Sequence, residues 1–242
     1  MKHQTVVVAV IALFITSCST KKGDDNMGLL DKIFGKKRSE NEMRSSFSDV
    51  TLSEKELQYC KNAKLSEQDG LLLKRLTNRP IEALIFENEM SEVEKPDAIG
   101  SMASEEKAKI IVLDNLDGYR TQGKYIFISS YTLNGYVVGV TSATSDPYAL
   151  MELSETNGLN YDIETKHIIE KYKKWDSEFG IIPIGIGFDF CECKIKTTNI
   201  DFKKLAREVY EFCPDVVDQG TETVEALEEE IKRTGMIYLW WD

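Results

Sequence analysis

The sequence has little of the material that most catalytic and metal sites require. Its 242 residues include only 2 histidines and 5 cysteines. Two histidines give little scope for imidazole catalysis or zinc binding, and five cysteines are too few for a disulfide scaffold of this length. Basic residues are also in the minority, with 30 Lys and Arg against 41 Asp and Glu and a formal net charge of −11. This balance disfavours nucleic acid as a partner, because phosphate binding needs a concentrated basic surface.

The N-terminal residues have the pattern of a sorting signal rather than of a membrane-spanning helix. The apolar run Val6–Ile15 is shorter than the roughly 20 residues that a helix needs to cross a bilayer, but it suits the apolar part of a secretory signal. The residues that follow, Thr16, Ser17 and Cys18, resemble the bacterial lipobox. This resemblance implies that residues 1–17 are removed as a lipoprotein signal peptide and that Cys18 carries lipid such as palmitate.

Two other interpretations of the N-terminus stay open, namely an ordinary signal peptide and a translation start at Met27. Residues 18–50 are expected to form a flexible basic tether. Within them, residues 29–38 place apolar and basic side chains at helical spacing, which favours either a short helix on an anionic membrane or a solvated linker. Residues 19–26 resemble the surface-export signal of Bacteroidetes lipoproteins. The expected location is therefore the cell envelope, with the lipid in the inner or outer membrane or at the cell surface.

Local signals predict both helices and strands in residues 51–130, the expected N-terminal α+β portion. Caps and apolar spacing predict helices over residues 53–63 and 66–77. An apolar pattern predicts a strand over 81–87, and an acidic loop is expected from there to Gly100. Residues 104–116 fit either a helix capped by Ser104 or a strand.

The second half of the chain has more regular periodicity. Ile168, Tyr172, Trp175 and Phe179 form one apolar stripe at helical spacing, and Gly180 is expected to end that helix. Further helices are predicted after Asp146, Asp201 and Thr221 or Thr223, and strands over residues 124–130, 136–142, 181–187, 190–195 and 236–241. Strands and helices do not alternate strictly, so we predict an α+β fold in which a mostly antiparallel sheet has helices packed on one face.

Three motifs follow one another in the last part of the chain. They are GFDF at residues 187–190, FCPDVVDQG at 212–220 and LWWD at 239–242. Together they resemble DUF4253, a bacterial domain of unknown function. The resemblance implies that residues 131–242 form a DUF4253-like domain with the fold of that family. It implies no activity, so function has to be argued from the residues.

The cysteines of this region have functional and structural interpretations. Cys191 and Cys193 are two residues apart on a predicted strand, so their side chains point to the same face. They are either a metal-binding or redox pair, or small apolar residues of the core. No second cysteine or histidine pair completes a tetrahedral site, so we expect no metal and no cofactor. The disulfide pairing of these residues with Cys60 and Cys213 stays open.

Cys213 is the one candidate for a nucleophile. His167 would then act as its base, with Asp215 or Asp242 orienting that base in a thiol-dependent hydrolase. The alternative is that Cys213, Pro214 and Asp215 form a turn that ends a helix, and the sequence favours this interpretation. We therefore expect no catalytic residues.

The C-terminal residues are the main candidates for a binding surface. Trp240 and Trp241 point to opposite sides of a strand, so one can anchor the core, while the other covers a helix or forms a partly exposed platform. Core packing is the favoured interpretation, and an exposed indole would be a candidate for recognition. The expected surface contains Asp189, Cys213, Asp215, Gln219, Trp240, Trp241 and Asp242. Its carboxylates, with that of Asp218, would form an acidic pocket if they lie close together.

These observations favour a lipid-anchored protein without catalytic function. We expect the acidic domain to bind another protein with a basic surface, for example as a neutralising partner of the immunity type. A thiol-dependent hydrolase using Cys213 and a module that binds divalent cations are the alternatives.

Overall fold

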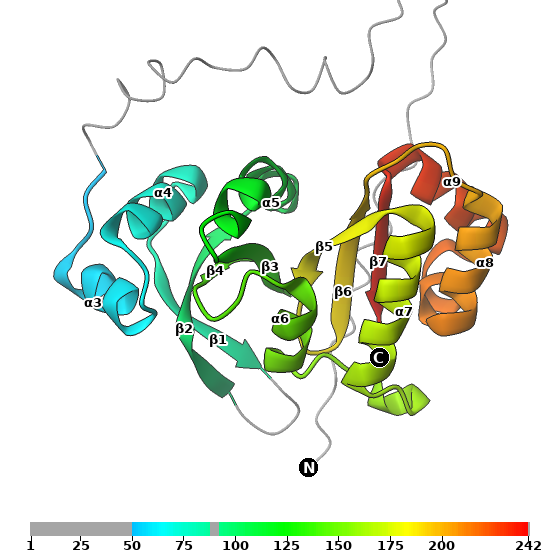
Figure 1. Cartoon of the computed structure of the whole chain (residues 1–242), viewed down its shortest axis with the longest axis horizontal. Helices are drawn as coiled ribbons and strands as arrows, with labels where there is room; N and C mark the ends of the chain where they lie inside the picture. Colours follow the sequence, from blue (N-terminus) through cyan, green and yellow to red (C-terminus); the bar gives the residue numbers. More distant parts are fainter. Residues whose placement is uncertain (1–49, 88–91, 242) are drawn as a thin grey trace, which may run out of the picture. The chain divides into compact units, whose positions relative to one another are not determined.

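The structure is a computed structural model that describes residues 50–87 and 92–241, without the side chains of residues 85–96 (Figure 1). Residues 50–242 form one compact unit of the chain. The expectations for the signal peptide, Cys18, the tether and Asp242 concern residues outside the described ranges. Within these ranges, no helix has the length and apolar character needed to cross a membrane.

The helices begin at capping residues that the sequence makes recognisable. Ser53 and Ser66 each form a capping box, and Asp146, Asp201 and Thr223 each accept a hydrogen bond from a first-turn amide. The helices are α3 (Glu54–Asn62), α4 (Glu67–Thr77), α5 (Glu105–Arg120), α6 (Pro147–Leu153), α7 (Thr165–Phe179), α8 (Phe202–Phe212) and α9 (Val224–Thr234). A short 3₁₀ turn, η1 (Leu159–Tyr161), and a π-helical turn, η2 (Val216–Thr221), complete the helical segments of the described residues.

The described strands form one seven-stranded sheet in the order β1-β2-β4-β3-β5-β6-β7. Neighbouring strands are antiparallel except β3 and β5, which are parallel, so the predicted α+β class with a mostly antiparallel sheet is confirmed. The strands are β1 (Glu82–Glu87), β2 (Glu92–Ala103), β3 (Tyr125–Thr132), β4 (Gly135–Thr141), β5 (Ile181–Ile186), β6 (Phe190–Ile195) and β7 (Met236–Trp240).

One local prediction before residue 121 is wrong. The expected acidic loop contains β2, which pairs with β1 on one side and with β4 on the other. The segment is rich in charged residues and lacks the apolar pattern on which the prediction relied. It still forms a strand because backbone pairing does not require apolar side chains. The helical alternative for the next segment is confirmed, since residues 105–120 form α5 with Ser104 at the N-cap position, although the Ser104 side chain makes no capping hydrogen bond.

Helices pack on both faces of the sheet rather than on one. Glu192 of β6 forms an ion pair with Lys109 of α5, at 2.8 Å, while its neighbour Cys191 lies against Tyr172 of α7. Because successive residues of a strand point to opposite faces, α5 and α7 lie on opposite sides of β6. Figure 1 shows α3, α4 and α5 beside β1 to β4, and α7, α8 and α9 beside β5 to β7.

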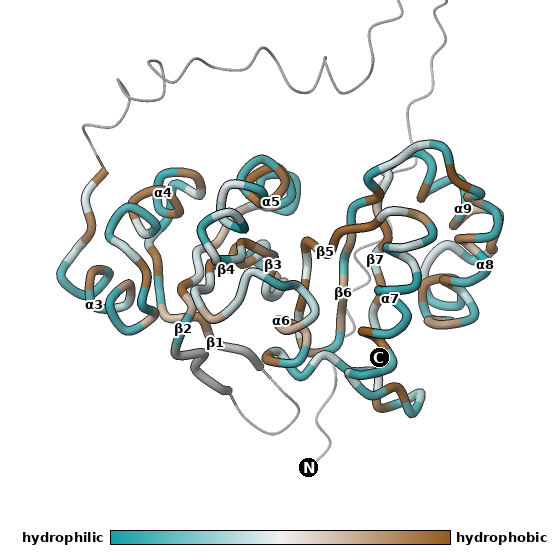
Figure 2. The backbone as a smooth tube through the Cα atoms, in the orientation of Figure 1, coloured by the Kyte–Doolittle hydropathy of each residue, from teal (hydrophilic) through white to brown (hydrophobic). Residues whose placement is uncertain are grey.

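The core is centred on β3 and β5, whose residues are covered on both faces. The four residues 125–128 are completely buried, and Figure 2 shows hydrophobic residues along both strands. The hydroxyl of Tyr125 donates to the carbonyl oxygen of Pro183 at 2.7 Å, so its single buried polar group is satisfied. The predicted stripe of α7 is confirmed, since all four of its residues are buried against this core.

Glu56 joins α3, α4 and β1 through a buried carboxylate. It receives hydrogen bonds from the Ser53 amide at 2.8 Å, the Ile81 amide at 3.1 Å and the Lys74 ammonium at 2.7 Å. Burial opposes its ionisation, but the hydrogen bonds from Lys74, Ser53 and Ile81 more than offset this and lower its pKa to about 2. One charged side chain therefore fixes three consecutive elements.

Replacing Glu56 by Gln is expected to lower the free energy of unfolding by about 2–3 kcal/mol at neutral pH, because it removes the ion pair and weakens buried hydrogen bonds. The folded-state pKa lies below the unfolded value, so this stabilisation is present above about pH 4.5 and is lost as the pH falls towards 2. Denaturant titrations across this range test both statements. The exposed Glu67→Gln variant should differ from wild type by less than about 0.5 kcal/mol, and an equal loss in both variants would contradict the argument.

Candidate functional site

The structure brings most of the predicted site residues together where β7 ends. The Cys213 thiol, directly after α8, donates to the carbonyl oxygen of Trp240 at 2.8 Å. The Trp241 amide donates to the carbonyl oxygen of Asp189 at 3.0 Å. Backbone contacts therefore join the end of α8, the β5–β6 turn and the C-terminal strand, while the Asp189 side chain is exposed.

Asp215 is the buried carboxylate of this region. Its Oδ1 accepts hydrogen bonds from the Tyr161 hydroxyl and from Nε2 of Gln219, the latter at 2.9 Å. The hydrogen bond to Asp215 raises the pKa of Tyr161 to about 12, because it stabilises the protonated phenol. Gln219 is exposed, and Asp218 accepts from the Tyr210 hydroxyl at 3.2 Å. Asp215 thus ties η1 to η2 through hydrogen bonds.

No group of three or more His, Cys, Asp or Glu side chains among the residues that the structure describes is arranged to hold a metal ion. Asp189, Asp215 and Asp218 each have protein partners. The acidic pocket expected from them also includes Asp242, which lies outside the described ranges, so this pocket stays a prediction.

The two tryptophans at the end of β7 lie on opposite faces of the sheet. Trp241 is 4% exposed and meets the Phe212 ring edge to face, with centroids 5.9 Å apart. It also fills the space above Gly158, where an added Cβ would lie 2.6 Å from the indole. Trp240 points to the other face and is partly exposed. Alternation along the strand predicts this division, and only packing decides which indole is covered.

Trp240 belongs to a row of aromatic rings that the sequence did not reveal. The row, here called the aromatic band, consists of Tyr136, Tyr131, Tyr238 and Trp240. Successive centroids are 6.3, 6.4 and 5.4 Å apart, so the rings are in contact across β4, β3 and β7. Tyr131 is 43% exposed and the other three rings are partly exposed. Phe190, which is buried, stacks on Tyr238 at 5.9 Å and supports the band from β6.

Glu192 lies on the same sheet face as the aromatic band. It is the cross-strand partner of Tyr238, and its side chain is 1% exposed. Its Oε1 pairs with Lys109, which also contacts Glu105 at 2.9 Å. Its Oε2 is buried without a hydrogen-bond partner among the described residues. Burial raises the pKa of Glu192 although Lys109 acts in the opposite direction.

The signal for this face was present in the sequence but incomplete. Alternation places Phe190 and Glu192 of β6 on one face, and likewise Tyr238 and Trp240 of β7. Tyr131 and Tyr136 come from the β3–β4 hairpin, which joins the same surface because β3 pairs with β5. Strand order is a tertiary property, so the sequence pattern could not bring the two halves of the band together.

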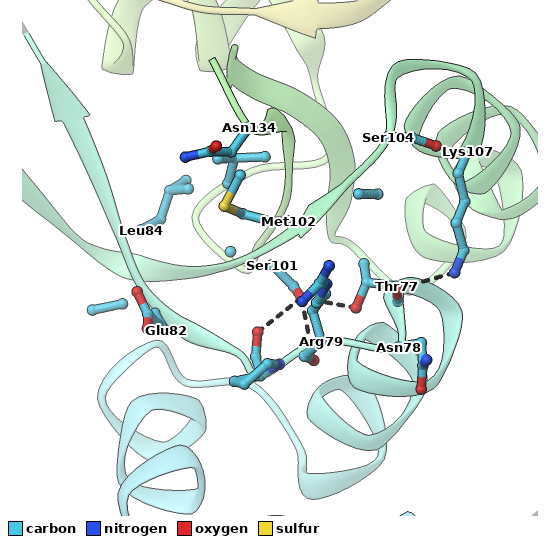
Figure 3. Close-up of a pocket in the computed structure, with 15 residues that line it drawn as sticks. Thr77, Asn78, Arg79, Glu82, Leu84, Ser101, Met102, Ser104, Lys107 and Asn134 are labelled. Carbon is cyan, nitrogen blue, oxygen red and sulfur yellow. Dashed lines mark hydrogen bonds between the residues drawn. The ribbon is translucent and has the colours of Figure 1, made fainter. Parts of the chain in front are cut away.

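A surface hollow of about 1100 Å³ lies beside the start of β1 and the end of β2 (Figure 3). Its walls include Leu84, Met102 and Val137. The Ser101 hydroxyl donates to the Pro80 carbonyl oxygen at 2.8 Å, and the Lys107 ammonium donates to the Thr77 carbonyl oxygen at 3.0 Å. These hydrogen bonds attach the segment after α4 to β2 and α5, which is a structural role.

Comparison with known families separates the predicted site at the end of β7 from the surface hollow beside β1 and β2. Residues 138–242 match the DUF4253 family. The family model is described as a domain of unknown function, and the match confirms the resemblance predicted from the motifs. No curated protein matches the chain, and no solved structure matches it either.

The matched residues 138–242, here called the DUF4253 segment, contain the described residues of the predicted site and half of the aromatic band. Asp189, Cys213, Asp215, Trp240 and Trp241 all lie within it, as do Phe190, Glu192 and Tyr238. Tyr131 and Tyr136 precede it, so the aromatic band crosses the boundary of the family match. The residues that line the hollow all precede residue 138.

The thiols of the DUF4253 segment are packed in its interior. Cys191, Cys193 and Cys213 are each buried with free thiols, as is Cys60 in α3. Burial raises the pKa of Cys213 to about 12 and the pKa values of the other three. Nδ1 of His167 accepts the Glu164 amide at 3.1 Å at the start of α7, where it takes part in a helix cap. This arrangement disfavours thiolate chemistry, which needs an accessible thiol of low pKa.

In the full chain carrying Cys18→Ser, the four remaining cysteines are expected to react with Ellman's reagent only on the timescale of unfolding, because all four are buried and protonated. The absorbance of the coloured product, measured at about pH 8, follows the reaction. The same protein unfolded in concentrated guanidinium chloride should release four equivalents of this product per chain at once. One equivalent released within seconds from the folded protein would contradict the burial of these thiols.

Proposed function

We propose that this protein is a lipid-anchored component of the bacterial cell envelope that binds another protein without catalysing a reaction. Cys18 attaches it to the membrane, and the unit from residue 50 onward carries the binding surface. The partner has a basic surface, and the interaction is of the neutralising or immunity type.

The aromatic band carries the proposal. Tyrosine and tryptophan are enriched at the centres of protein interfaces because a rigid ring offers large contact area together with a polar atom. Tyr131, Tyr136, Tyr238 and Trp240 form such a surface, and the neighbouring Leu133 is 82% exposed. An exposed apolar group of this kind typically marks an interaction site.

Charge supports a basic partner. The chain has a formal net charge of −11, and α9 presents Glu225, Glu229 and Glu230 to solvent. Complementary charge accelerates encounter and disfavours acidic competitors. The buried thiols and the helix-capping role of His167 favour binding over the thiol-dependent hydrolase.

The lipid anchor is expected to depend on Cys18. When the full chain is produced in a bacterial host with labelled palmitate, wild type should incorporate label and fractionate with membranes. The Cys18→Ser variant should lose the label and leave the membrane fraction, since a cysteine thiol is the attachment point. Cys60→Ser is the matched control and should keep both properties. Labelling that persists in Cys18→Ser would exclude this anchor.

Binding rather than catalysis is expected to survive replacement of Cys213 by Ser. Cross-linking of the lipidated full chain in membranes, followed by affinity purification, should give the same cross-linked protein with wild type and with Cys213→Ser. Its yield should fall with added salt, because screening weakens contacts between an acidic surface and a basic partner. Absence of any specific cross-linked protein, or a substrate turned over by wild type and not by Cys213→Ser, would refute the proposal.

A further inference from the structure

We propose that the aromatic band binds the arginine or lysine side chains of a basic segment of the partner protein, with Glu192 beneath it supplying the opposite charge. This inference rests on the proposed function and specifies the chemistry of its binding surface.

The geometry of the rings suits a cation. Cations bind over the faces of tryptophan and tyrosine within about 6 Å of the ring centroid. The rings of Tyr131, Tyr238 and Trp240 meet at angles of 64° and 36°, so their faces are inclined to one another rather than coplanar. Inclined rings offer a cation contact with more than one face. Tyr136 extends the row to the β3–β4 hairpin.

The negative charge of Glu192 indicates that the group bound by the aromatic band is a cation. Glu192 has one oxygen paired with Lys109 and one buried oxygen without a hydrogen-bond partner among the described residues. An unsatisfied buried carboxylate oxygen is costly, and a nearby cation reduces that cost. Lys109 also contacts Glu105, so two carboxylates share one ammonium and the group is negative by one charge when all three are ionised.

Lys194 lies on the same face of β6 as Glu192 and, like Lys109, is a cation. Its ammonium donates to the Thr234 carbonyl oxygen at 3.1 Å, beside Gly235, where β7 begins. It therefore occupies the end of the strand pair opposite to Trp240. The surplus negative charge lies next to Tyr238, the cross-strand partner of Glu192, where a cation in reduced contact with water gains more from it than a fully solvated one.

The test uses the full chain carrying Cys18→Ser and two synthetic peptides, one of alternating glycine and arginine and one with citrulline in place of arginine. Citrulline keeps the shape of arginine but has no charge. Fluorescence anisotropy of labelled peptides should show binding of the arginine peptide and at least about tenfold weaker binding of the citrulline peptide. Equal binding of the two peptides would overturn the inference.

Variants assign the binding to the band. Trp240→Leu and Tyr131→Leu keep an apolar side chain but remove the ring, and each should weaken arginine-peptide binding by at least about fivefold, whereas Trp240→Phe should keep most of it. Leu159→Ala, in the exposed η1 turn, and Glu152→Gln, on α6, are controls that should leave binding unchanged. Loss of binding in Glu152→Gln without loss in Trp240→Leu would show general attraction to acidic residues and would refute the site.

Glu192→Gln tests the charge beneath the rings and should weaken binding of the arginine peptide by about fivefold at low salt. Because this variant leaves Lys109 unpaired, the double variant Lys109→Gln/Glu192→Gln, with folding checked by thermal melting, provides the same test without an isolated buried cation. Unchanged binding in the folded double variant would overturn the role of Glu192. Tighter binding of a proline-rich peptide or a glycan oligomer than of the arginine peptide would overturn the choice of occupant.

The outcomes separate this inference from the proposed function. If the native partner still cross-links to the Trp240→Leu chain, the protein is a binder but the band is not its cation site. If the arginine peptide binds as expected and the envelope contains no specific partner, the site stands and the proposed function fails.

Discussion

The alternation of side chains along β6 determines what each face of the C-terminal half presents. Cys191 and Cys193 point into the interior beneath α7, while Phe190 and Glu192 point to the face that borders α5. A shift of one residue in the pairing of β6 would exchange these two sets. It would place Phe190 and Glu192 beneath α7 and the thiols on the face that borders α5, so the register of β6 with β5 and β7 is the constraint on which both faces depend.

That register explains why the cysteines and the aromatic residues have different roles. The interior face accepts small apolar thiols, and burial raises their pKa values, so they act as packing residues. The other face holds a buried ion pair between Glu192 and Lys109, which is costly to desolvate and worth little for stability by itself. This charged pair lies on the same sheet face as the partly exposed rings of the aromatic band.

The predicted site and the aromatic band lie on opposite sides of β7 and share its last residues. The backbone of Trp240 accepts the Cys213 thiol, and its side chain belongs to the band. Trp241 locks the interior side against Phe212. Packing around Cys213, Asp215 and Trp241 thus fixes the end of β7 and, with it, the position of Trp240.

The helices, most of the strands and the DUF4253 match of residues 138–242 were predictable from the sequence, because they depend on local chemistry. Capping serines, the apolar stripe of α7 and the α+β class depend on residues near one another in the chain, so their spacing carries the information. The tertiary structure decided that helices cover both faces, that β2 fills the expected acidic loop and that Tyr131 meets Tyr238. These features depend on strand order and on pairing between distant segments, and alternation along a single strand shows which residues share a face but not what that face meets.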